Sequence, residues 1–269
     1  MTDSWWLKVK RAQKHMVDIY HLARAYSETN PYEFIRVRLP NRHRKVRYTV
    51  RITEQPDPML AIMVGDFVHN LRSALDHIVV ANVPRKERKN AYFPVSREDL
   101  WATDESGNFV VKDDKRRDDF KRAIRGLKPR AEAAVIIAQP YQGTPVDQEL
   151  LGIISRLENA DKHRELAVVL SGVSRVSAMA INRLGVWVDR PPYDVVYPDG
   201  ATIDWELLPD DPTPPSEVYV QFSGTTTVHI SVTSTGGNLP PIHIPLENSL
   251  LNMLRFTRRL IRGIEILSG

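Results

Sequence analysis

The feature that most constrains this chain is a change in hydrophobic period along its length. Up to about residue 170, apolar residues mostly recur every three or four positions, which indicates amphipathic helices. From about 174 to 243, β-branched and aromatic residues alternate with polar ones, which indicates strands. Helical spacing returns over 246–267. The pattern predicts an α+β protein: a helical bundle with an antiparallel β-sheet against it, and a C-terminal helix that returns to the bundle.

The same periods place the individual elements. We predict helices over residues 5–27, 59–83, 120–125, 131–138 and 146–170. A β-hairpin with a basic outer face is predicted over 33–53, where apolar residues alternate with arginines.

The domain organisation follows from these elements. We expect one α+β domain over residues 1–269, with a helical part at about 5–170 and 246–268 and a β-rich part at about 172–245. A separate β domain over about 172–245 is the alternative.

Composition excludes several classes of protein. The 269 residues include no cysteine, which excludes a disulfide-stapled secreted protein, a thiolate metal site and a cysteine nucleophile. No run approaches the roughly 20 apolar residues of a membrane span, and the start M-T-D-S-W-W-L does not resemble a signal peptide, so we expect a cytoplasmic protein without membrane contact. A net charge of +4 permits an anionic partner such as RNA without requiring one.

Polar chemistry is concentrated on the predicted helix 59–83. At about 100° per residue, its apolar residues share one side, and the string D-F-V-H-N-L-R-S-A-L-D-H at 66–77 supplies the other. Solvated helix faces usually carry Lys, Glu, Gln and Arg, which form helices better than Asp, His, Asn and Ser do. We therefore interpret this face as a candidate site, with a buried polar network that holds helices together as the alternative. The polar residues are Asp66, Asn70, Ser73 and His77 in a narrow stripe, flanked by His69, Arg72 and Asp76.

The predicted helix 146–170 has an apolar stripe that Asp161 and Arg164 interrupt. A carboxylate on a packing face needs a charged or hydrogen-bonding partner. We predict that D-K-H-R, which is Asp161, Lys162, His163 and Arg164, contacts the polar face of 66–77 as binding residues. The alternative is that Asp161 pairs with Arg164 one turn along its own helix.

Four strings carry a family resemblance: G-D-F-V-H-N-L-R-S-A-L-D-H at 65–77, F-P at 93–94, Q-P-Y at 139–141 and D-K-H-R at 161–164. Together they resemble a widespread family of uncharacterised bacterial proteins. Within them, Arg72 to His77 resembles the R-x-x-x-x-H motif of HEPN proteins, which are helical bundles, often dimeric and often metal-independent ribonucleases. Ser73 follows the arginine, where HEPN nucleases commonly have Asn or Asp.

The resemblance implies roles for two residues. His77 would be the general acid or base, and Arg72 would stabilise the phosphorane, which suits a group that titrates near neutrality and a guanidinium that grips phosphate oxygens. We add Asn70, His69 and Asp76 to the candidate catalytic group and Asp66 and Ser73 to the binding group.

Three functions are therefore open. The first is a HEPN-like RNA-binding protein or metal-independent endoribonuclease, without a cofactor and as a possible homodimer, whose basic segments at 36–51, 85–89, 112–130 and 255–262 contact phosphates. The second is a metal site in which Asp66 and His69, one turn apart, are completed by other residues of the two polar helices. The third is a non-enzymatic binding or defence-associated module in which the polar face is a structural network.

Overall fold

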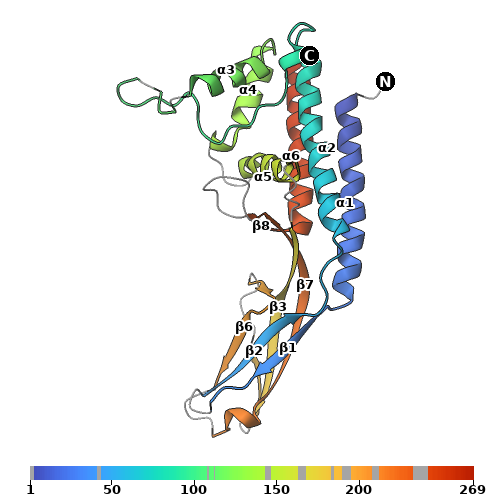
Figure 1. Ribbon diagram of the computed structural model, residues 1–269, viewed down its shortest axis with the longest axis vertical. Helices are drawn as coiled ribbons and strands as arrows, with labels where there is room; N and C mark the ends of the chain where they lie inside the picture. Colours follow the sequence, from blue (N-terminus) through green and yellow to red (C-terminus); the bar gives the residue numbers. More distant parts are fainter. Residues whose placement is uncertain are drawn as a thin grey trace.

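The structure, a computed structural model, describes residues 3–40, 44–107, 109–111, 113–142, 147–162, 168–182, 185–189, 195–207, 212–232 and 242–269. The molecule is elongated, with helices gathered at one end and strands at the other (Figure 1). The predicted α+β class is confirmed. No helix in the described parts of the chain is long and apolar enough to span a lipid bilayer.

Three long helices run side by side: α1 (Ser4–Glu28), α2 (Met59–Asn82) and α6 (Leu246–Ser268). The indole N–H groups of Trp5 and Trp6 on α1 both donate to Glu265 Oε1 on α6, at 2.6 and 2.8 Å. The C-terminal helix thus returns to the bundle, as predicted. Shorter helices complete this end, namely α3 (Asp114–Ala123), α4 (Pro129–Ile137), α5 (Asp147–Lys162) and the 3-10 turns Arg88–Asn90 and Pro140–Gln142.

The strands form two antiparallel sheets. The predicted hairpin is confirmed as β1 (Tyr32–Val37) and β2 (Lys45–Ile52), and β6 (Thr202–Glu206) extends it to the order β1-β2-β6. The second sheet has the order β4-β3-β7-β8, with β5 paired to β3. Its strands are β3 (Val168–Asn182), β4 (Gly185–Asp189), β5 (Tyr197–Pro198), β7 (Tyr219–Val232) and β8 (Ile242–Pro245), and the 3-10 turn Pro215–Glu217 precedes β7.

The two sheets pack face to face through aromatic residues. The Phe34 ring of β1 stacks on Phe222 of β7 with 4.7 Å between centroids, and Tyr48 of β2 meets the same ring edge-on at 4.7 Å. The hairpin therefore lies with the β-rich part, whereas the sequence pattern places residues 5–170 in the helical part. The single-domain organisation over 1–269 stays a prediction.

Strand β7 also reaches the helical end. Its residues Val228 and Ile230 are buried in the apolar core that α1, α2, α5 and α6 share. The same strand contributes Val220 to the core between the sheets. A single strand therefore belongs to both cores.

Two predicted helix boundaries are wrong. The helix predicted over 146–170 does not extend to Leu170, because residues 168–170 begin β3 and pair with β7, with Val168 opposite Ser231. β-branched Val168 and Val169 suit a strand, and the ladder with β7 outweighs the helical spacing. The helix predicted over 120–125 begins earlier, at Asp114, since the Asp113 side chain accepts a hydrogen bond from the Arg116 N–H at 2.9 Å and caps it.

An ion-pair cluster joins β2 to β6. Asp204 accepts hydrogen bonds from Arg47 Nε at 2.6 Å and from Lys45 Nζ at 2.7 Å. These bonds, chiefly the one from Arg47, stabilise the charged carboxylate and hold the pKa of Asp204 well below its ordinary value.

We expect Asp204→Asn to lower the melting temperature at pH 7 by about 2 °C. A depressed carboxyl pKa stabilises the fold above the unfolded-state pKa of about 4, and that contribution is lost as the pH falls further. The difference from wild type should therefore shrink below about pH 4 in a calorimetric pH series. Glu33→Gln, at the more exposed pair with Arg51, is the control and should change the melting temperature little. A difference that grows toward low pH would contradict the prediction.

Candidate functional site

The polar face predicted on α2 is divided between two sides of the helix. His77 Nδ1 lies 3.1 Å from Ser4 Oγ on α1. Asp66 lies on the same side, near His15 of α1, where its charge partly offsets the lowering of the His15 pKa by burial. His69, Arg72 and Asp76 instead point toward α5 and residues 93–96. Arg72 and His77, five residues apart, project about 140° from one another around the helix axis.

Arg72 is at the centre of the second side. It is buried, and its Nη2 donates to the Phe93 carbonyl at 2.5 Å. Its Nη1 lies 3.1 Å from Asp76 Oδ1 as a charge contact, and its Nε lies 3.5 Å from Glu158 Oε2 on α5. Two carboxylates and one carbonyl thus surround a guanidinium that has left water, which is the arrangement that makes such burial tolerable.

Glu158 is the carboxylate that sequence reasoning missed. It is 6% exposed, and its Oε1 lies 3.8 Å from His69 Nδ1. The signal was present, because Glu158 follows Leu151 by seven residues and Ile154 by four and so shares their apolar stripe.

The contact predicted for D-K-H-R stays a prediction. Asp161 and Lys162 lie in the last turn of α5, but their side chains are outside the described residues. His163 and Arg164 lie outside them altogether.

A segment at 93–96 is held between α2 and the end of α4. Asp76 Oδ1 accepts from the Phe93 N–H at 2.9 Å, so both backbone groups of Phe93 are bound to α2. Gln139, fully buried, accepts from the Ser96 N–H at 2.8 Å and donates to the Pro94 carbonyl at 3.0 Å. The strings R-S-A-L-D-H, F-P and Q-P-Y therefore meet in one polar network, which we call the Arg72 network.

The remaining candidates of α2 lie apart from the Arg72 network. Asn70 is buried and donates to the Asp66 carbonyl one turn back on its own helix at 2.7 Å. Ser73 is half-buried. Among the described side chains, no three His, Asp or Glu residues come together as a metal site requires.

A second polar feature is the outer side of α6, which we call the arginine face. Its members are exposed at spacings of three and four residues and, with Asn252, line a shallow surface hollow. In the described part of the chain, neither Arg255 nor Arg258 forms an ion pair with a carboxylate. The Arg262 guanidinium lies 5.9 Å from the centre of the Trp6 ring. The arginine face consists of Arg255, Arg258, Arg259 and Arg262.

Two other basic segments are largely used within the protein. In the hairpin, Lys45 and Arg47 are paired with Asp204. In α3, Arg116 pairs with Glu98, and Arg122 pairs with Asp119. Their charges are compensated locally, so these segments offer less attraction to an outside anion than the arginine face does.

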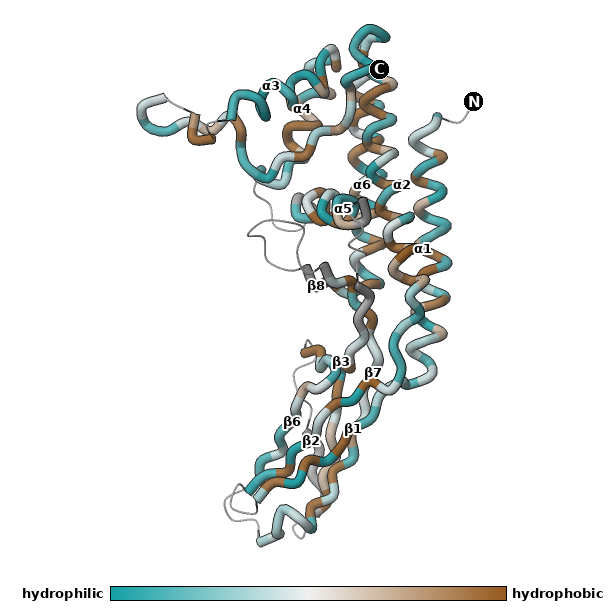
Figure 2. The backbone as a smooth tube through the Cα atoms, viewed as in Figure 1, coloured by the Kyte–Doolittle hydropathy of each residue, from teal (hydrophilic) through white to brown (hydrophobic). Residues whose placement is uncertain are grey.

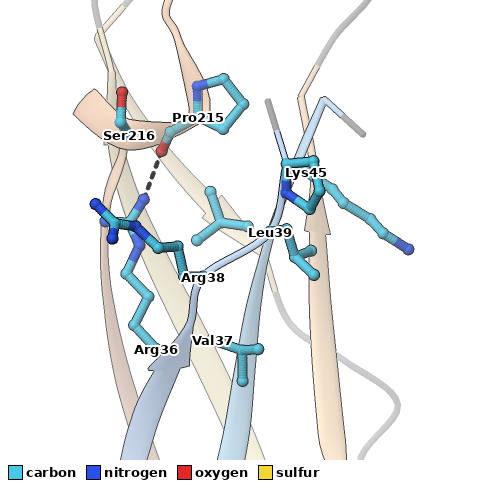
Figure 3. A pocket seen from close by; sticks show the side chains of 9 residues that line it. Arg36, Val37, Arg38, Leu39, Lys45, Pro215 and Ser216 are labelled. Carbon is cyan, nitrogen blue, oxygen red and sulfur yellow. Dashed lines mark hydrogen bonds between the residues drawn. The ribbon is translucent and has the colours of Figure 1, made fainter. Parts of the chain in front are cut away.

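At a hollow on the tip of the β-sandwich, an arginine is likewise bound within the protein. Figure 3 shows Arg36 and Arg38 side by side next to Pro215 and Ser216. Arg36 donates to the carbonyls of Val218, at 2.9 Å, and Pro215. Arg36 thus ties together two backbone carbonyls just before β7, which is a structural role.

Comparison with family models, curated proteins and solved structures finds no match to this chain. The resemblance to HEPN proteins therefore stays a prediction.

Proposed function

We propose that the protein binds RNA along the arginine face of α6, and that the Arg72 network supports the fold rather than the ligand. The observation that carries the proposal is the row of exposed arginines, which extends about 10 Å along one helix. Guanidinium groups bind phosphate oxygens in a fixed fork, and a row of them can contact more than one phosphate of a chain. Because α6 is anchored at both ends of the bundle, it holds these guanidinium groups at a fixed spacing.

The contacts of the Arg72 network favour a structural role over a catalytic one. A phosphate at Arg72 would have to displace Glu158 and Asp76 and leave a buried carboxylate without its guanidinium, which is costly. His77, at Ser4, lies on another side of the helix. The geometry therefore supports binding of RNA better than its cleavage.

The proposal is tested by titrating the protein into a labelled single-stranded RNA of about 20 nucleotides at several salt concentrations. For three to four phosphate contacts, the logarithm of the association constant should fall with the logarithm of salt at a slope of about −2 to −3. Binding that is absent at low salt, or that does not depend on salt, would overturn it.

The same mixture, with EDTA, tests the ribonuclease function that the R-x-x-x-x-H motif predicts. We expect the RNA to remain intact over hours. Cleavage that is lost in both Arg72→Lys and His77→Ala would instead assign the catalytic roles that the resemblance implies. The cytoplasmic location expected from the sequence and the homodimer that the HEPN resemblance suggests both stay predictions.

A further inference from the structure

An apolar groove lies between α4 and α6, next to the arginine face. Ala134 and Ile137 of α4 form one wall, and Leu260, Gly263 and Leu267 of α6 form the other, over the buried ring of Phe256. Figure 2 shows the apolar residues that recur along both helices. From Phe256 to Leu267 the groove follows α6 for about 16 Å, or three helical turns.

The groove is open to a large neighbour. Ile137 is 65% exposed, which is unusual for an isoleucine beside other apolar groups. Apart from the adjacent residues and the backbone of α6 itself, no atom in the described part of the chain lies within 4 Å of the position that a Cβ on Gly263 would occupy. Another helix could therefore approach the α6 backbone closely at this point.

The positive charge around the groove favours an acidic occupant. Arg130 and Arg259 line it, and the rest of the arginine face continues from its edge. A symmetric second copy would add its own two arginines to the same interface, so that four like charges would gather around one apolar seam. An occupant with carboxylates beside its apolar residues would be attracted.

We infer that this groove docks an amphipathic helix of another protein, with apolar residues that enter the groove and acidic residues that meet Arg130 and Arg259. A helix of about three turns matches the length of the groove, and apolar residues at every third or fourth position match its single seam. This docking site does not depend on RNA binding, because Arg255 and Arg258 lie outside the groove and can be changed without it.

The test uses a labelled synthetic helix of about 15 residues, with leucine at every third or fourth position and glutamate beside the leucines. Its affinity for the full chain is measured by fluorescence anisotropy, and a peptide with lysine in place of glutamate is measured in parallel. The glutamate peptide should bind at least about 10-fold more tightly than the lysine peptide.

Two variants locate the binding. Gly263→Leu fills the groove and Ile137→Asp charges it, and each should weaken the glutamate peptide at least about 10-fold. Ile266→Asp is the matched control, because Ile266 is 78% exposed on the same helix but does not line the groove, and it should bind the peptide as wild type does. Gly263→Leu places its side chain in open space, so it reports on docking even where Ile137→Asp affects folding.

Three outcomes would overturn the inference. Equal binding of the two peptides would show that the groove does not prefer acidic residues. Wild-type binding by both groove variants would place the peptide elsewhere. A concentration-dependent dimer that Ile137→Asp abolishes would assign the groove to a second copy of this chain.

Discussion

Arg72→Met is expected to lower the free energy of unfolding by about 3–5 kcal/mol, because it removes the cation beside which Glu158 is buried. The change keeps much of the side-chain volume, so little of the loss comes from a cavity. It also removes the hydrogen bond to the Phe93 carbonyl that ties residues 93–96 to α2. Urea denaturation followed by circular dichroism measures the effect.

The double variant Arg72→Met with Glu158→Met distinguishes charge burial from lost packing. With both charges replaced by apolar groups, we expect most of the stability to return, since no buried carboxylate is then left without its guanidinium. Arg255→Met, an exposed arginine of α6, is the control and should change stability by less than about 0.5 kcal/mol. An Arg72→Met protein as stable as wild type would show that the Arg72 network does not support the fold.

The triple variant Arg255→Gln, Arg258→Gln and Arg262→Gln is expected to weaken RNA binding about 100-fold at moderate salt. Each guanidinium–phosphate contact contributes on the order of 1 kcal/mol, and three together give this factor. The salt slope should become less steep by about 2, since three phosphate contacts are lost. The side chains are exposed, so the melting temperature should change little.

A second triple variant controls for net charge. Arg24, Arg51 and Arg122 are exposed arginines on three separate elements, and their change to glutamine removes the same three charges. If the arginine face is the binding surface, this protein should bind RNA within a few-fold of wild type. Equal losses in the two triple variants would indicate general attraction to a basic protein.

Much of the fold could be predicted because hydrophobic period is a local property. The spacing over 59–83 places a helix where α2 lies, and the alternation over 33–53 places the hairpin. The beginning of β3 at Val168 could not be read in this way. Three residues that continue a helical stripe can equally begin a strand, and the choice depends on the ladder with a strand some sixty positions later.

Local periodicity is equally limited in predicting the candidate site. Periodicity indicates that Arg72 and Asp76 leave the apolar side of α2, but not which element faces them. Glu158 and the Phe93 backbone come from distant parts of the chain, and their meeting with Arg72 is set by how α5 crosses the bundle. The sequence points to Asp161 because it interrupts an apolar stripe, but it does not single out Glu158, one turn earlier, whose contact with Arg72 the structure shows.

The continuity of β7 has a mechanical consequence. This strand is laddered to β3 from Tyr219 to Ser231 and enters the cores of both ends of the molecule, so no loop separates the helical end from the sandwich along it. The helical end and the sandwich are therefore connected rigidly by a continuous strand and not by a flexible linker along β7. The ladder is irregular between Ser174 and Ser177, where Arg175 adopts a left-handed backbone with φ of 50°. Bending of the long axis should concentrate at that bulge, and a force applied at the sandwich tip should reach α6 through β7 and β8.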